Sequence, residues 1–281
     1  MNWPLVEAIW LREHCADDNL RIVDTRFALG KPDHGRTSYL QGHIPSAVFV
    51  DLERDLCAQV RADRVGGRHP IPPVAALEAV LGRLGISNQH LVVAYDDPSA
   101  GTGFYAAHLW WLLHYLGHDN VVVLNGGLPA WVAAGGAVET REPFVNSSEF
   151  RAQPRPEMIV DAVTVQSRPE STILLDSRAP ERFRGEIEPL DWKAGHIPGA
   201  LNANWADGLR DGFWKSPSEQ RERLPEAQDL IVYCGSGVSA AGNLLALEIA
   251  GVTHAKLYPG SWSDWISDDS RPIATGPLPC G

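Results

Sequence analysis

The stretch DLIVYCGSGVSAAGNLLALEIAG, residues 229–251, decides the fold of this chain. It begins with a short apolar run that has the length of a buried strand. It ends in an Ala- and Leu-rich segment with helical spacing, which stops at Gly251, a residue suited to a helix C-cap. The pattern therefore predicts a strand, a tight glycine-containing loop and a helix, with Cys234 where the strand ends.

A cysteine at the end of a strand and before a helix is placed for nucleophilic chemistry. The N–H groups of a glycine-rich loop can converge on its sulfur, and the helix N-terminus adds partial positive charge. Both effects favour the thiolate, which is the reactive form of cysteine. The other interpretation is that Cys234 is a buried structural residue, because free cysteine packs as a small hydrophobic side chain.

Length and charge limit the classes of function. A chain of 281 residues is typical of about two domains. The formal net charge of −11 argues against nucleic acid and anionic membranes as partners. No apolar run reaches membrane-spanning length, and the residues after Met1 lack the basic and apolar pattern of a signal peptide. We therefore expect a cytoplasmic protein.

The four cysteines do not form a recognisable framework. They are Cys15, Cys57, Cys234 and Cys280, and no two of them make a Cys-x-x-Cys pair. Such wide spacing resembles neither a disulfide scaffold nor a zinc site, so we expect reduced thiols and no metal. Only Cys234 lies in a loop suited to chemistry.

The sequence repeats itself loosely at about half its length. Four landmarks return in the same order: 22–26 as 174–178, 42–45 as 195–198, 92–96 as 230–234 and 126–131 as 260–265. Each copy alternates short apolar runs with helical patterns, which predicts parallel sheets with helices on both faces. Ligands bind at the carboxyl ends of the strands in such sheets. Cys234 lies at such an end, and Asp96 takes its place in the first copy.

The repeats predict two domains joined by a linker. Residues 141–158 are polar and contain three prolines, which is typical of an extended connection. We place the first domain at residues 1–142 and the second at 157–281. The pairs Asp24–Arg26 and Asp176–Arg178 occur in both copies, as do His43 and His196, and we interpret them as structural.

The landmarks resemble those of the rhodanese superfamily, and in particular its two-domain sulfurtransferases. The resemblance covers nearly the whole chain and rests on residues 176–178, 195–200, 234–239 and 260–265. It implies an α/β fold of two tandem rhodanese-like domains, of which the first is inactive with Asp96 at the cysteine position. It also implies that a sulfane sulfur passes through a persulfide on Cys234, without a metal or an organic cofactor.

The loop is similar to that of the 3-mercaptopyruvate branch, which reads Cys-Gly-Ser-Gly-Val-Thr/Ser. The thiosulfate branch has basic residues directly after the cysteine, whereas Gly235 and Ser236 follow it here. The resemblance implies that 3-mercaptopyruvate, a small anion, donates sulfur to cyanide, a thiol or a protein. Thiosulfate:cyanide sulfur transfer on the same fold is the alternative.

The resemblance also implies roles for particular residues. His69 and Ser236 would act with Cys234, and the loop residues Gly235, Gly237, Val238 and Ser239 would contact the substrate. Arg182 and Arg184, from the segment Arg-Phe-Arg-Gly, would bind the donor carboxylate, because a guanidinium binds oxygen pairs bidentately. The alternatives are a solvated charged loop for the arginines, a loop-forming role for Ser236 and a surface position for His69.

One position departs from the branch. Its members usually carry a second arginine after Glu-Pro, but Leu190 follows Glu188-Pro189 in this chain. Lys193 is the candidate to replace the missing cation.

Two other classes of protein are alternatives to a sulfurtransferase. A cysteine phosphatase or arsenate reductase has an arginine six positions after the cysteine to hold phosphoryl oxygens, but that position is Ala240. A non-catalytic sulfur carrier would also fit the fold, although a complete loop around Cys234 favours an enzyme.

Overall fold

The computed structural model describes residues 4–100 and 103–277. Contacts divide the chain into two units, the first made of Met1–Cys57, Pro72–Arg155 and Arg210–Trp214, and the second of Ala58–Ile71, Pro156–Leu209 and Lys215–Gly281. Residues Ala58–Ile71 therefore interrupt the first unit and pack with the second. The domain limits 1–142 and 157–281 stay a prediction, and Cys280 lies outside the described residues.

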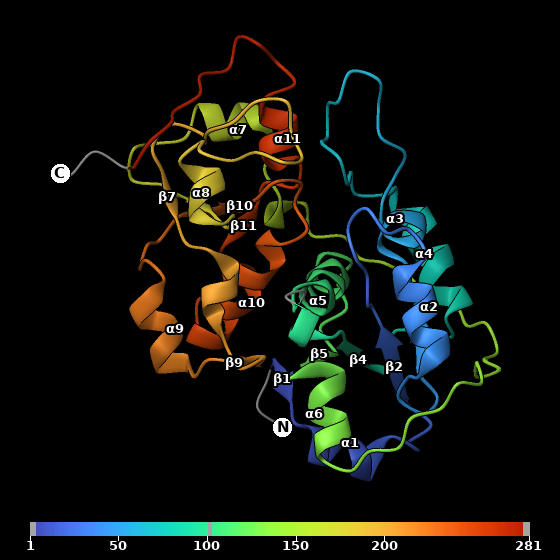
Figure 1. The fold of residues 1–281 in the computed structure, drawn as a ribbon. Coiled ribbons are helices and arrows are strands. Elements are labelled where there is room, and N and C mark those ends of the chain that lie inside the picture. Colours follow the sequence, from blue (N-terminus) through green and yellow to red (C-terminus); the bar gives the residue numbers. More distant parts are fainter. Residues whose placement is uncertain (1–3, 101–102, 278–281) are drawn as a thin grey trace. The chain divides into compact units, whose positions relative to one another are not determined.

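The first unit is built on a five-stranded parallel sheet with the order β1-β5-β4-β2-β3. Its strands are β1 (Leu5–Val6), β2 (Leu20–Asp24), β3 (Val48–Phe49), β4 (Leu91–Tyr95) and β5 (Val121–Leu124). Its helices are α1 (Ala8–His14), α2 (His34–Gln41), α3 (Leu52–Asp55), α4 (Val74–Arg83), η1 (Pro98–Ala100), α5 (Tyr105–Tyr115) and α6 (Gly127–Ala133). Helix α5 packs against β4 and β5, and α1 packs against α6 (Figure 1).

The second unit contains a four-stranded parallel sheet with the order β11-β10-β6-β7. Its strands are β6 (Ile173–Asp176), β7 (Ala200–Asn202), β10 (Leu230–Tyr233) and β11 (Lys256–Leu257), and β8 (Leu209–Arg210) pairs with β9 (Phe213–Trp214). The helices are η2 (Pro156–Met158), α7 (Ala162–Gln166), α8 (Pro180–Phe183), η3 (Trp205–Gly208), α9 (Pro217–Arg223), α10 (Ala240–Ala250) and α11 (Ser261–Trp265). The predicted α/β fold of two tandem domains with parallel sheets is confirmed.

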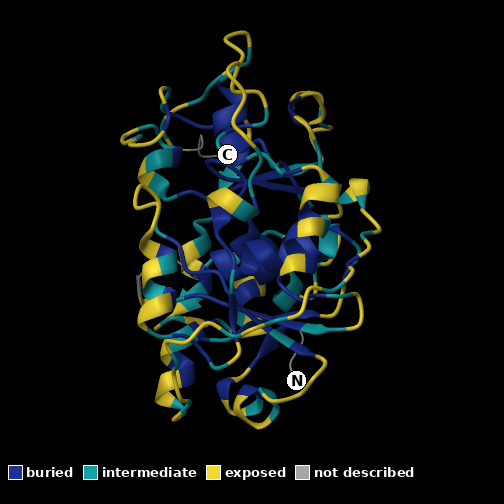
Figure 2. Ribbon diagram, turned by 90° about the vertical axis from the view of Figure 1, so that its right-hand side faces the viewer, coloured by how far each residue is buried: buried dark blue, intermediate teal, exposed yellow. Residues whose placement is uncertain are grey.

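The central strands are apolar because helices cover them. The helices that pack against these strands are largely apolar as well. Strand β10 is fully buried, as is most of α10, including the polar Asn243. In each unit the buried residues follow the strands, and the exposed ones lie on the outer turns and loops (Figure 2). Helix α10 ends at Gly251, whose φ of 88° is left-handed and therefore suits glycine. The strand, loop and helix predicted around Cys234 are thus confirmed.

The internal repeat reappears as repeated hydrogen bonds. Arg26 binds Asp24 and the carbonyl of Gly42, and Arg178 binds Asp176 and the carbonyl of Gly195 in the same way. Each pair is buried at the carboxyl end of a strand. These charges are therefore structural in both units, as predicted.

The repeated histidines also bind backbone. His43 Nδ1 lies 2.7 Å from the carbonyl oxygen of Tyr39, and His196 Nδ1 lies 2.7 Å from that of Phe183. The main chain of His43 pairs with Glu139, and that of His196 pairs with Ala274. Both histidines therefore have the predicted structural role.

The proline-containing connection is bound to the first unit along part of its length. The N–H groups of Ser148 and Gln153 donate to the carbonyls of Gly82 and Leu116. Arg155 makes a bidentate ion pair with Asp119.

Among the helices of the described residues, none is long and apolar enough to cross a membrane.

Candidate active site

Cys234 is the first residue after β10, and its loop is held from behind by α11. The N–H of Cys234 donates to Ser261 Oγ at 3.0 Å. In return, the N–H groups of Trp262 and Ser263 donate to the carbonyls of Cys234 and Gly235 at 3.0 and 2.9 Å. These bonds turn the carbonyls of Cys234 and Gly235 toward α11. The N–H groups of the residues that follow Cys234 face away from α11.

The loop N–H groups form a candidate anion site. In the described part of the chain, the N–H groups from Gly235 to Ser239 donate to no protein oxygen. They precede the first turn of α10, where the N–H groups of Ala241 and Gly242 donate back to the carbonyls of Val238 and Ser239 at 3.1 Å. Gly237 has a φ of +84°, and a Cβ there would overlap the carbonyl of Pro259. This arrangement suits an anionic sulfur at Cys234, which is only 1% exposed.

The structure brings His69 and Ser236 together. His69 Nδ1 lies 2.7 Å from Ser236 Oγ, although the two residues are 167 positions apart. Both belong to the second unit, since Ala58–Ile71 packs there. Burial, and then the nearby charge of Arg68, lower the pKa of His69 to about 4. His69 is therefore neutral at pH 7 and can accept a hydrogen bond.

Helix α11 also anchors the segment that carries His69. The N–H of Gly66 donates to Asp264 Oδ1 at 2.7 Å, and the N–H of Arg68 donates to Ser263 Oγ at 3.1 Å. A Cβ on Gly67, whose φ is +79°, would press on the carbonyl of Gly260. The Gly-Ser-Trp-Ser-Asp-Trp motif thus fixes both the cysteine loop and the histidine segment.

Arg182 lies beside the cysteine loop within a cluster of charges. It donates to both carboxylate oxygens of Glu188, at 2.7 and 3.1 Å, and lies 3.4 Å from Asp191. Arg68 pairs with the other oxygen of Asp191. The guanidinium groups of both arginines approach Gly235, where a Cβ would lie 3.2 Å from Arg68 Nη2 and 3.3 Å from Arg182 Nη2.

Three residues considered from the sequence lie outside this cluster. Arg184 pairs with the exposed Glu186, with 2.7 Å between Nε and Oε1. Lys193 pairs with Asp269, whose side chain is 93% exposed, and Leu190 is 42% exposed. The structure therefore assembles Cys234, Ser236, His69 and Arg182, and does not bring Arg184 or Lys193 to them.

Sequence reasoning missed three members of the cluster: Arg68, Glu188 and Asp191. Arg68 directly precedes His69, so its place beside a candidate histidine was the available signal. Glu188 and Asp191 resembled solvated acids of a loop, yet their side chains are only 3% and 1% exposed.

The remaining described cysteines lie elsewhere. Cys15 and Cys57 belong to the first unit, and burial raises the pKa of the Cys57 thiol. Within residues 4–100 and 103–277, no group of three or more His, Cys, Asp or Glu is placed to hold a metal ion.

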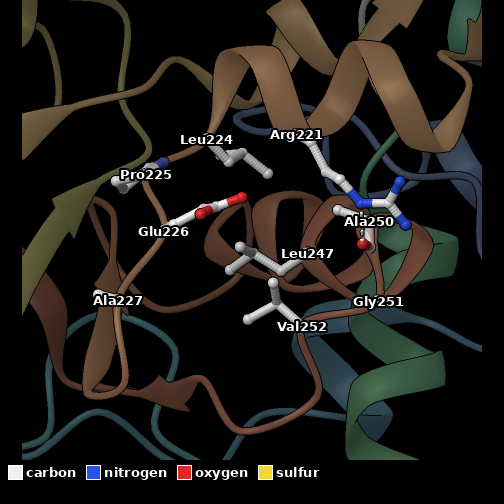
Figure 3. Close-up of a pocket in the computed structure, with 9 residues that line it drawn as sticks. All are labelled: Arg221, Leu224, Pro225, Glu226, Ala227, Leu247, Ala250, Gly251 and Val252. Atoms are coloured by element: carbon white, nitrogen blue, oxygen red, sulfur yellow. Dashed lines mark hydrogen bonds between the residues drawn. The ribbon is translucent and has the colours of Figure 1, made fainter.

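A separate pocket of about 350 Å³ lies at the far end of α10 (Figure 3). Leu224, Leu247 and Val252 line it, and Arg221 donates to the carbonyl of Ala250 at its edge. It contains none of the predicted site residues, because the cysteine loop precedes the opposite end of this helix.

The low pKa of His69 predicts a pH-dependent stability. Above pH 6.5 both the folded and the unfolded protein carry neutral His69. As the pH falls from 6.5 to about 4, the unfolded state gains a proton that the folded state excludes. We expect this site to remove about 3 kcal/mol from the free energy of unfolding across that interval.

Urea titrations of wild type and His69→Gln between pH 7 and pH 4 measure this effect. The two free energies of unfolding should converge as the pH falls. Curves that stay parallel over the whole interval would show that His69 is not held neutral.

A family model and known proteins match this chain. The model described as rhodanese-like domain matches residues 7–134 and 161–268. A Pseudomonas aeruginosa protein named as a 3-mercaptopyruvate sulfurtransferase is 45% identical, with 97% of this chain and 98% of that protein covered. A Mycobacterium tuberculosis protein named as a thiosulfate sulfurtransferase is 42% identical, with 93% of each covered.

A solved structure gives the same fold. The crystal structure of the Escherichia coli 3-mercaptopyruvate enzyme SseA is similar with a TM-score of 0.81. Its sequence is 34% identical, and the match covers 92% of this chain and 98% of that one.

Proposed function

Because this chain belongs to the rhodanese family and is a sulfurtransferase, we propose that it uses 3-mercaptopyruvate as its sulfur donor. The observation that carries the proposal is the position of Arg182, whose guanidinium approaches Gly235 directly after Cys234. The cysteine loop itself has no cationic side chain, so the arginine is suited to the carboxylate of a keto acid. The relatives in Pseudomonas and Escherichia that bear this name support the same donor.

The first half-reaction forms a persulfide. The Cys234 thiolate attacks the sulfur of 3-mercaptopyruvate, the bond between that sulfur and its carbon breaks, and the electron pair leaves with the enolate of pyruvate. The enolate takes up one proton to become pyruvate. The loop N–H groups from Gly235 to Ser239, including those of Gly237 and Val238, stabilise the anionic sulfur.

His69 and Ser236 handle the proton. Neutral His69 accepts a hydrogen bond from the hydroxyl of Ser236, with 2.7 Å between Nδ1 and Oγ. In the proposed mechanism, the hydroxyl of Ser236 gives its proton to the enolate and takes one back from the outer sulfur of the persulfide, which carries the thiol proton of the donor. His69 positions the hydroxyl for this relay.

The second half-reaction returns the thiolate. A thiolate or cyanide attacks the outer sulfur of the persulfide, the S–S bond breaks, and Cys234 leaves as thiolate. The acceptor is cyanide, a small thiol or a protein thiol, and we propose that the reaction takes place in the cytoplasm. The absence of metal, organic cofactor, nucleic acid and membrane as partners stays a prediction.

Thiosulfate is the second candidate donor, and the 42% identity to the Mycobacterium tuberculosis protein favours it. A side-by-side measurement of kcat/KM for 3-mercaptopyruvate and thiosulfate, with cyanide as the acceptor, tests the proposal. A higher value for thiosulfate would contradict the proposed donor and leave the sulfurtransferase class intact.

Removing Arg182 should weaken the use of 3-mercaptopyruvate. A charge-assisted contact to a carboxylate is worth about ten- to a hundredfold in binding. We expect Arg182→Ala to lower kcat/KM for 3-mercaptopyruvate by about this factor and for thiosulfate by less. Arg184→Ala, measured in parallel, tests the second predicted arginine. We expect a smaller effect there because the Arg184–Glu186 pair lies on the surface. If Arg182→Ala lowered kcat/KM equally for both donors, the proposed contact between Arg182 and the donor carboxylate would be ruled out.

A further inference from the structure

We propose that the pocket at the far end of α10 binds a small zwitterion whose ammonium and carboxylate groups are joined by an apolar chain. All the residues that line the pocket belong to the second unit, and none of them belongs to the cluster around Cys234. The inference therefore goes beyond the proposed function and does not depend on the sulfur donor.

The first argument is the size and the lining of the pocket. Its volume of about 350 Å³ lies in the range of small-molecule sites. Leu224 and Leu247, which are 6% and 0% exposed, form apolar walls together with Val252. Walls of this kind suit a hydrocarbon chain, because burial removes its apolar surface from water.

The second argument is a pair of opposite charges that do not neutralise each other. Figure 3 shows the Glu226 carboxylate and the Arg221 guanidinium on opposite sides of the pocket, with apolar side chains between them. Within the described residues, the side chain of Arg221 donates one hydrogen bond, from Nε to the carbonyl of Ala250 at 2.8 Å, and Glu226 forms no ion pair. Both Nη groups and the carboxylate are therefore left for a ligand.

The balance of charge selects the class of ligand. Arg221 and Glu226 are the two charged residues among the nine that line the pocket. A simple carboxylate would be repelled by Glu226, and a simple amine would be repelled by Arg221. A zwitterion pairs with both. Because Leu224 and Leu247 lie between the charges, a ligand with an apolar spacer fits better than an α-amino acid, whose two charged groups share one carbon.

The third argument is that hydrogen bonds fix the walls of the pocket without a ligand. The bond from Arg221 to Ala250 joins α9 to the end of α10. On the side of Glu226, His254 Nε2 lies 2.9 Å from the carbonyl oxygen of Ala227. Preformed walls lower the entropy cost of binding.

Titration of the full chain with 6-aminohexanoate, followed by ligand-observed NMR at low salt, tests the inference. Hexanoate and hexylamine have a similar chain and lack one charge each, and glycine has both charges without the chain. We expect 6-aminohexanoate to bind about fivefold more tightly than hexanoate or hexylamine, which is the effect of one partly exposed charge pair. Glycine should also bind more weakly. Equal affinities for all four probes would overturn the inference.

Two variants assign the charges. Glu226→Gln should weaken binding of 6-aminohexanoate about fivefold without weakening hexanoate, and Arg221→Gln should do the same without weakening hexylamine. Arg221→Lys keeps the charge and should retain most of the affinity. The matched control is Glu222→Gln, which removes an exposed carboxylate of α9 outside the pocket and should change no affinity. If Glu226→Gln weakened every probe equally, the assigned role of its charge would be wrong.

Cys234→Ser separates this pocket from the cysteine loop, which precedes the opposite end of α10. The variant should bind 6-aminohexanoate as wild type does. Loss of binding in Cys234→Ser would place the probe at the cysteine loop and overturn the inference. Unchanged binding in a variant without sulfur transfer would support a separate site.

Discussion

Cys234→Ser is expected to abolish sulfur transfer, with a loss of about three orders of magnitude or more in kcat. A serine hydroxyl at this position is a far weaker nucleophile toward sulfur, and it cannot carry a persulfide. The fold should survive, because Ser261 Oγ and the N–H groups of Trp262 and Ser263 bind the main chain of the loop, which the substitution leaves unchanged. Steady-state kinetics with each donor measure the loss.

The described cysteines of the first unit provide the control. Cys15→Ser and Cys57→Ser should retain most activity, since neither residue lies in the second unit. Mass spectrometry of donor-treated wild type should place one added sulfur on the Cys234 peptide. Near-normal turnover by Cys234→Ser would end the persulfide mechanism.

The second large effect is expected on stability, from the buried ion pair between Arg178 and Asp176. Arg178 is 1% exposed and lies 2.6 Å from Asp176 and 3.4 Å from Glu188. Arg178→Met would leave two buried carboxylates without this partner. We expect it to lower the free energy of unfolding by about 3–5 kcal/mol, measured by urea titration.

The internal repeat supplies a matched variant for this test. Arg26 makes the same pair with Asp24, also at 2.6 Å, in the copy that has Asp96 instead of a cysteine. Arg26→Met should destabilise by a similar amount. Only Arg178→Met should also weaken donor use by the folded enzyme, because Glu188 positions Arg182. If both variants changed kcat/KM equally, the Arg178 ion pair would have no specific role in positioning Arg182.

Local pattern was enough to predict the fold and to single out Cys234 as the candidate nucleophile. The apolar run before Cys234, the glycine loop and the helix ending at Gly251 are contiguous, so their periodicity and capping residues predict them without tertiary information. The repeated landmarks predicted two α/β copies for the same reason. The resemblance then led from these motifs to sulfur transfer.

The surroundings of Cys234 depended on long-range packing. The segment that carries Arg68 and His69 is far along the chain from the residues that anchor it, Ser263 and Asp264. No local pattern in the sequence predicts which unit Ala58–Ile71 packs against. The acids of the loop after Arg182 resemble solvated residues in the sequence, and only tertiary structure shows that they are buried and paired. The sequence by itself therefore determined the scaffold and pointed to Cys234 as the candidate nucleophile. Tertiary structure decided which histidine and which arginines reach it, because those contacts form only when separated segments pack together.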